Sequence, residues 1–198
     1  QKIDLLSLTA HKIFGPMGIG ALYVGNKPRV RLEPIFSGGG QEKGLRSGTL
    51  APALCVGLGE ALRIADEEML GDAARLGALR DQMWQRLNGS VPGLVLNGSM
   101  TDRIGVNLNF SVDGADAEIL MAALPGLAVS SGSACSSASD DSSHVLKAIG
   151  LSNALAEASL RIGLGRFTTA DEVESATNQL IKAITALRDG RYETAAAE

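Results

Sequence analysis

The sequence lacks several features that would assign it to a specialised class of protein. It has only two cysteines, Cys55 and Cys135, and their settings differ too much to suggest a disulfide framework. No apolar run approaches the ~20 residues of a membrane-spanning helix, and no signal-like segment precedes a hydrophobic stretch. The net charge is small and negative, at −4, which argues against a surface built for nucleic acid or an anionic membrane. We therefore expect a cytoplasmic protein with no direct nucleic-acid or membrane partner.

The composition is otherwise that of a globular protein. Hydrophobic residues make up 45% of the 198, enough for one domain or two small ones, and the 24 glycines gather in particular loops. The first residue is Gln1, and strand-like sequence follows almost at once. We therefore expect a segment of a longer protein, or a processed chain.

The hydrophobic pattern predicts helices alternating with strands. Alternating apolar residues indicate strands, and apolar residues at helical spacing indicate helices. Strands are expected at 4–8, 20–24, 104–112, 127–130 and 160–164, and helices at 51–70, 76–87, 115–124 and 169–187. The last helix opens with a capping box, Thr169 to Glu172, and Trp84 is expected at the edge of a core. This order of elements predicts an α/β fold.

The first candidate site is a lysine at the point where the first strand gives way to a glycine-rich turn. Lys12 follows His11 and precedes a run of turn-forming residues: Gly15, Pro16, Gly18 and Gly20. A lysine held on such a turn is well placed to bond an aldehyde cofactor through its ε-amino group. Taken alone, it would more often be a solvated cation.

The second candidate is Cys135, which lies among small residues from Ser130 to Ser139. This segment has little apolar mass with which to bury a thiol, so an exposed, nucleophilic cysteine is favoured over a packing role. Cys55 sits within an apolar helical pattern, where packing is favoured. The third candidate is Arg161, which the alternation of Leu160 and Ile162 turns to the face opposite the apolar one.

Together these segments resemble the cysteine desulfurases of the NifS/IscS type, within the class V aminotransferase-like pyridoxal phosphate enzymes. Four motifs occur in the order of that family, and they cover essentially the whole chain. They are His11-Lys12 with the following glycines, the loop from Gly38 through Arg46 to Thr49, the segment from Ser130 to Cys135, and Arg161 with Gly165, Arg166, Phe167 and Thr168.

The resemblance implies a fold and a domain division. The fold would be pyridoxal phosphate transferase fold type I. Residues 1–66 would be the end of the large cofactor-binding domain with a connecting helix, and residues 67–198 the small C-terminal α/β domain that carries the nucleophile. The family's upstream contacts to the cofactor ring would lie outside this chain, so the isolated segment is expected to be inactive.

The resemblance also implies roles for particular residues. Lys12 would hold pyridoxal 5′-phosphate covalently and move protons on the substrate. The side chains of Thr9 and His11 would contact the cofactor phosphate, and Thr49 would do so across a homodimer interface. Arg161 would bind the carboxylate of the substrate.

Cys135 would take sulfur from L-cysteine as a persulfide, leaving L-alanine. The implied partners are iron–sulfur scaffold proteins or other sulfur acceptors, including those for tRNA thiolation. No metal site is expected, although Cys135 could transiently contact an iron–sulfur cluster through its persulfide.

Other functions remain open at this point. A related fold type I enzyme, such as a selenocysteine lyase or an aminotransferase, could share the lysine region without needing Cys135. The SufS-like desulfurases usually have a histidine before a shorter nucleophile segment, which this chain lacks. A sulfur-carrier or interaction module would use Cys135 without binding cofactor at Lys12.

Overall fold

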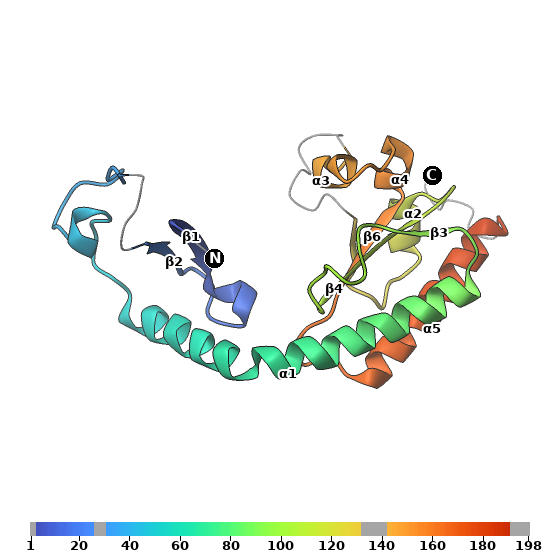
Figure 1. The fold of residues 1–198 in the computed structure, drawn as a ribbon, viewed down its shortest axis with the longest axis horizontal. Helices are drawn as coiled ribbons and strands as arrows, with labels where there is room; N and C mark the ends of the chain where they lie inside the picture. Colours follow the sequence, from blue (N-terminus) through green and yellow to red (C-terminus); the bar gives the residue numbers. More distant parts are fainter. Residues whose placement is uncertain (1–2, 26–30, 132–141, 191–198) are drawn as a thin grey trace. The chain divides into compact units, whose positions relative to one another are not determined.

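The computed structural model describes residues 3–25, 31–131 and 142–190 (Figure 1). It divides into two compact units, Gln1–Met69 and Leu70–Glu198, whereas the expected domain boundary lay between residues 66 and 67. The first unit carries residues 9–19 around Lys12, the lysine turn. The second unit carries a sheet packed against helices.

The first unit is built around a β-hairpin. Strands β1 (Leu5–Thr9) and β2 (Gly20–Val24) pair antiparallel, with Thr9 opposite Gly20. Both strands were expected at nearly these bounds. The connection between them contains the 3₁₀ helix η1 (Ala10–Ile13), and a second 3₁₀ helix, η2 (Glu42–Gly44), lies in the later glycine-rich loop.

One long helix, α1, runs without interruption from Pro52 to Ser90. The break expected near residue 70 is absent. The buried apolar positions of α1 form two groups, Leu58 and Ala61 in its first part and Leu76, Met83 and Leu87 in its second. Residues 62–75 between these groups are mostly exposed. The helical repeat of buried apolar residues is therefore interrupted there, although the helix continues. The prediction was wrong because an interruption in the apolar pattern was interpreted as the end of the helix.

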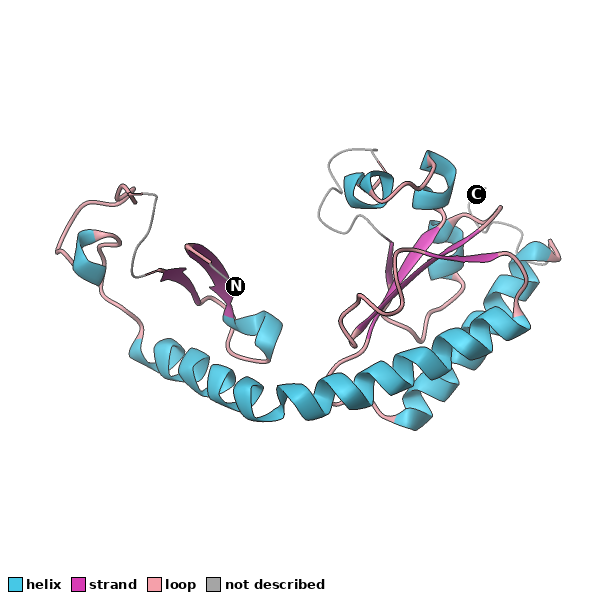
Figure 2. Ribbon diagram, in the orientation of Figure 1, coloured by secondary structure: helices cyan, strands magenta, loops and turns pink. Residues whose placement is uncertain are grey.

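The second unit contains a four-stranded sheet in the order β3-β4-β6-β5, with every pair antiparallel (Figure 2). The strands are β3 (Leu94–Leu96), β4 (Asn107–Val112), β5 (Ser130–Ser131) and β6 (Ser159–Gly163). Within the described residues of this unit, the α-helices besides α1 are α2 (Ala117–Ala122), α3 (His144–Ala148), α4 (Asn153–Glu157) and α5 (Ala170–Arg188).

The core of the second unit lies between one face of this sheet and the helices α1 and α5. Phe110 of β4 and Leu160 of β6 are fully buried on that face, and Leu180 of α5 is fully buried against it. Burying side chains of this size stabilises a fold by about 1.5–3 kcal/mol each. Trp84 is partly buried at the edge, as expected, with its ring centroid 6.1 Å from that of Phe110. The opposite face carries polar residues on its two central strands: Asn109 and Ser111 of β4, and Ser159 and Arg161 of β6.

Several boundaries and short elements differ from expectation. The helix expected from residue 115 begins at Ala117, because the Asp116 side chain caps it by accepting hydrogen bonds from the backbone N–H groups of Glu118 and Ile119. The strand expected at 127–130 pairs only at Ser130–Ser131. The capping box of α5 is confirmed in both directions between Thr169 and Glu172. Strand β3 and helices α3 and α4 were not predicted, since each is too short to show a period.

Candidate functional site

The lysine turn is held in place by Ala10, which is fully buried at the start of η1. The backbone N–H of Ala10 donates to the carbonyl of Ile19 at 3.1 Å, and the N–H of Gly15 donates to the carbonyl of Ala10 at 2.9 Å. These bonds close the turn on both sides of Lys12. Lys12 itself is exposed, one residue before the end of η1.

The turn also packs closely on helix α1. A Cβ atom at Gly57 would lie 2.8 Å from Cγ of Pro16, and one at Gly15 would lie 3.0 Å from Cβ of Ala61. Neither site has room for a larger residue without movement of its neighbour. Glycine at position 57 thus permits close packing of the turn on this helix, whereas a Cβ at Gly59 would meet nothing within 4 Å.

Two of the four residues expected to contact a cofactor phosphate or aldehyde lie within hydrogen-bonding distance of each other. Oγ1 of Thr9 lies 3.0 Å from Nδ1 of His11, within hydrogen-bonding distance. The structure thus gathers a hydroxyl, an imidazole and, on the next residue, the amine of Lys12 on one short exposed turn. A hydroxyl and an imidazole suit a phosphate, and an amine suits an aldehyde, so the donor set fits pyridoxal phosphate.

Thr49 follows the second glycine-rich loop, which is ordered by contacts of its own. The N–H of Gly48 donates to Oε1 of Gln41 at 3.0 Å, and the guanidinium of Arg46 lies 4.7 Å from the ring centroid of Phe36. Ser47 is buried, whereas Thr49 is exposed. The loop therefore presents the Thr49 hydroxyl to its surroundings.

Arg161 lies on β6, on the face of the sheet opposite the core, as its alternation with Leu160 and Ile162 predicted. It pairs in register with Asn109 of β4 on one side and with Ser130 of β5 on the other. Its Nε donates to Oγ of Ser130 at 3.1 Å, and the residue is exposed. It belongs to the second unit, whereas Thr9, His11, Lys12 and Thr49 belong to the first.

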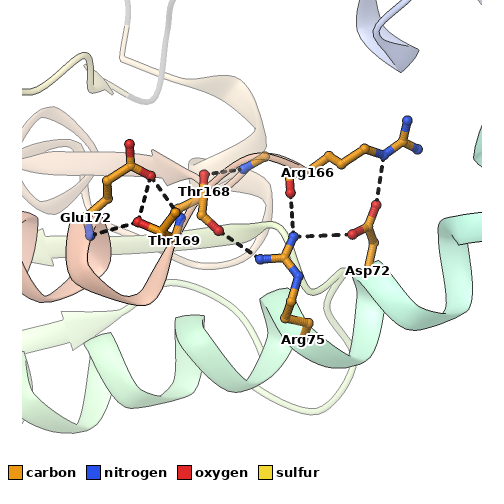
Figure 3. A network of polar contacts seen from close by, with 7 residues as sticks. Asp72, Arg75, Arg166, Thr168, Thr169 and Glu172 are labelled. Atoms are coloured by element: carbon orange, nitrogen blue, oxygen red, sulfur yellow. Dashed lines mark hydrogen bonds and ion pairs between the residues drawn. The ribbon is translucent and has the colours of Figure 1, made fainter.

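The motif that follows Arg161 is tied to α1 by an ion pair and hydrogen bonds, shown in Figure 3. Nε of Arg166 lies 3.0 Å from Oδ2 of Asp72, and Arg75 donates to the carbonyl oxygens of Arg166 and Thr168 at 2.5 and 2.8 Å. The hydrogen bond from Arg166 holds the pKa of Asp72 below its ordinary value, against a smaller opposing effect of burial.

The sequence analysis missed this arrangement, since Asp72 and Arg75 carry no motif. Their helical spacing on α1 could have indicated an ion pair between them, but not their contact with a segment more than 90 residues away.

The two cysteines are placed differently. Cys135 lies outside the described residues. Cys55 lies in the first turns of α1 and is partly buried, with its N–H bonded to the carbonyl of Ala51. That setting agrees with a packing role.

Two features are absent from residues 3–25, 31–131 and 142–190, the described ranges. No group of three or more His, Cys, Asp or Glu side chains within them is placed to hold a metal ion. No helix within them is long and apolar enough to cross a membrane.

The fold and the lysine turn define a class of protein. The family model for class-V aminotransferases matches residues 1–175, and the chain belongs to that family. Within it, the chain is 53% identical over 188 residues to "Cysteine desulfurase IscS" of Histophilus somni, and 52% identical over 188 residues to that of Pseudomonas aeruginosa. Each match covers 95% of this chain and 46% of the relative, so the chain spans about half the length of these curated relatives.

The solved structures agree with this placement. A structure titled as a NifS-like protein matches with a TM-score of 0.80 at 28% identity, covering 93% of this chain and 47% of the other. The predicted family and the predicted α/β fold of pyridoxal phosphate fold type I are therefore confirmed. The roles of individual site residues remain predictions.

Proposed function

We propose that this chain is part of a pyridoxal-phosphate-dependent cysteine desulfurase that converts L-cysteine to L-alanine and passes the sulfur to acceptor proteins. The observation that carries the proposal is the 53% identity to a cysteine desulfurase across 95% of the chain. The lysine turn supports it, because its hydroxyl, imidazole and amine match what the cofactor requires.

Three residues of the lysine turn, and Thr49 in the later loop, have proposed tasks in binding the cofactor. Lys12 holds the cofactor through its ε-amino group and later carries a proton to or from the substrate Cα. Thr9 and His11 contact the cofactor phosphate. The 3.0 Å distance between Oγ1 of Thr9 and Nδ1 of His11 supports this assignment, because the two side chains lie together. Thr49 contacts the phosphate group of the cofactor that is bound by the partner subunit of a homodimer. When bound, pyridoxal phosphate supplies an electron sink for bonds at the Cα of an amino acid.

The sulfur step uses Cys135. Its thiolate attacks the sulfur of L-cysteine, an S–S bond forms, and the substrate C–S bond breaks. The carbon that loses sulfur gains a proton, so the products are L-alanine and a persulfide on Cys135, and no external oxidant is needed. Arg161 holds the substrate carboxylate, a task that suits a planar guanidinium.

The proposed sulfur acceptors, compartment and oligomeric state follow from the same similarity to cysteine desulfurases. The persulfide would pass to an iron–sulfur scaffold protein or to a relay for tRNA thiolation. The protein would act in the cytoplasm as a homodimer.

Substitution of Lys12 tests the function in the full-length protein that contains this chain. Lys12→Ala should abolish both the visible absorption of the bound cofactor and the release of alanine from L-cysteine. Lys182→Ala, an exposed lysine on α5, is the matched control and should change neither. Borohydride reduction followed by peptide mapping should attach the cofactor to Lys12; attachment to another lysine would refute this assignment.

A further inference from the structure

Four polar residues form a row across the sheet of the second unit, on the face opposite the core. Asn109 of β4, Arg161 of β6 and Ser130 of β5 are direct cross-strand partners. Asn97 extends the row beyond β3, because its N–H donates to the carbonyl of Asn109 at 3.0 Å. Arg161 carries the only charge in this row.

Ser130 holds one particular nitrogen of Arg161. A guanidinium has five N–H donors, one on Nε and four on its two terminal nitrogens. The Nε of Arg161 donates to the Ser130 hydroxyl at 3.1 Å. Within the described part of the chain, no hydrogen bond engages the terminal nitrogens. The bond therefore fixes the plane of the guanidinium and leaves the pair of donors that a carboxylate accepts side by side.

Asn109 flanks Arg161 from the other strand and is itself fixed. Nδ2 of Asn97 donates to Oδ1 of Asn109 at 2.6 Å and to Oγ of Ser111 at 2.9 Å. Asn97 and Ser111 are buried, and the Ser111 hydroxyl is also bonded to the carbonyl of Leu155 at 2.7 Å. Asn109 is thus a rigid neutral neighbour of Arg161.

A second arginine of the same segment shows the opposite arrangement. Arg166 forms an ion pair with Asp72, whereas Arg161 has no ion pair among the described residues. A carboxylate beside a guanidinium would compensate its charge and weaken its attraction for an anionic ligand. A hydroxyl orients the guanidinium without compensating it.

We infer that Ser130 and Asn109 are positioning residues for Arg161, which orient its guanidinium while leaving its charge uncompensated for the substrate carboxylate. This inference rests on the proposed function, because Arg161 must be the carboxylate-binding residue. It adds two residues that the four family motifs did not assign to substrate binding, and it explains why their side chains are neutral.

The test compares two ligands that differ only in the carboxylate. L-alanine and ethylamine are titrated into the full-length protein carrying its cofactor, and binding is followed by calorimetry and by the cofactor absorption. Arg161→Ala should abolish the preference for alanine. Ser130→Ala should weaken alanine by about 3- to 10-fold, the usual effect of one lost hydrogen bond, and leave ethylamine unchanged. Ser130→Thr should restore alanine binding.

Asn109→Asp tests the charge argument with almost no change of shape, since the new side chain can still accept from Asn97. It should weaken alanine by at least 10-fold and leave ethylamine unchanged or tighter. This variant also decides the matter if Ser130→Ala does not fold. Ser175→Ala on α5 is the matched control for loss of an exposed hydroxyl and should change neither ligand.

The outcomes separate the inference from the proposed function. If Arg161→Ala loses the preference for alanine while Asn109→Asp and Ser130→Ala bind both ligands as the wild type does, the inference is wrong and the function stands. Equal weakening of both ligands in these variants would show a merely structural role and also overturn it. If Arg161→Ala still prefers alanine, or if the wild type neither binds cofactor nor releases alanine, the inference falls with the assignment on which it rests.

Discussion

At the scale of single residues, the two cysteines carry the sharpest prediction. Transfer to a partner needs a thiol that can leave the cofactor, which a cysteine within a helix cannot do. In the full-length protein, Cys135→Ser should keep the cofactor but stop sulfur transfer, because a hydroxyl is a poor nucleophile toward sulfur at neutral pH. Cys55→Ala removes a partly buried thiol from α1 and should leave turnover near normal.

Mass spectrometry after a brief pulse of L-cysteine measures this directly. One added sulfur is expected on the peptide that contains Cys135 and none on the peptide that contains Cys55. Sulfur on Cys55, or full transfer by Cys135→Ser, would contradict the proposed mechanism.

The residue scale also shows what sequence patterns can locate. Arg161 was assigned to the non-core face because its neighbours Leu160 and Ile162 alternate with it, and a strand has a period of two. The alternation of Leu108 and Phe110 places Asn109 on the non-core face in the same way, but it does not show that Asn109 lies beside Arg161. Cross-strand register depends on long-range pairing that a local pattern does not specify.

At the scale of elements, two glycines in α1 make a matched pair. A methyl group at position 57 would meet the Pro16 ring at 2.8 Å, so Gly57→Ala should displace the lysine turn and destabilise the protein by about 1–3 kcal/mol. A methyl group at position 59 meets nothing, so Gly59→Ala should stabilise the helix by about 0.5–1 kcal/mol.

Urea denaturation of the full-length protein gives both values, and the cofactor absorption reports on the turn. A Gly57→Ala variant as stable as Gly59→Ala would show that the contact between Pro16 and α1 does not constrain the turn.

The link between α1 and the segment after β6 is a second element-scale prediction. Asp72→Asn should lower the thermal unfolding temperature at pH 7, because it removes the ion pair with Arg166. The folded-state pKa of Asp72 lies below its ordinary value of 3.8, so the stabilisation is present above that pH and is lost as pH falls through the folded-state pKa. The difference between the variant and the wild type should therefore shrink in acid.

Glu60→Gln is the control for this experiment. Glu60 pairs with Arg63 one turn away on α1, with both side chains 53% exposed, so its loss should matter less. A difference for Asp72→Asn that persists unchanged well below pH 3.8 would show that the carboxylate charge is not the cause.

Elements were predictable where the local sequence determines them. The β1–β2 strands and the α5 capping box follow from alternation and from Thr169 and Glu172, and each was found. The continuity of α1 through residue 71 was not predicted, because helix propensity persists where burial lapses. The tie between Asp72 and Arg166 joins residues 94 positions apart and has no local signature.

At the scale of the whole molecule, the first unit exposes much apolar surface. The hairpin has only two strands, and Leu22, Tyr23 and Phe14 are 52%, 52% and 56% exposed. A two-stranded hairpin is marginal in water without further strands or packing. The 198 residues expressed alone should therefore self-associate, bind pyridoxal phosphate poorly and turn over no cysteine.

Light scattering and cofactor titration of the purified 198-residue chain test this expectation. A monodisperse monomer that binds one cofactor per chain and releases alanine from cysteine would contradict it.

The placement of Arg161 within β6 has a consequence for how the gene can vary. Successive residues of β6 face opposite sides of the sheet, with Leu160 and Ile162 in the core and Arg161 outside it. Loss or gain of one codon between Ser159 and Arg161 would turn the arginine into the core and bring an aliphatic side chain to the proposed carboxylate site. A substitution that keeps the length of this strand changes one position on one face, whereas a single in-frame deletion there would remove the proposed carboxylate recognition and core packing in one event.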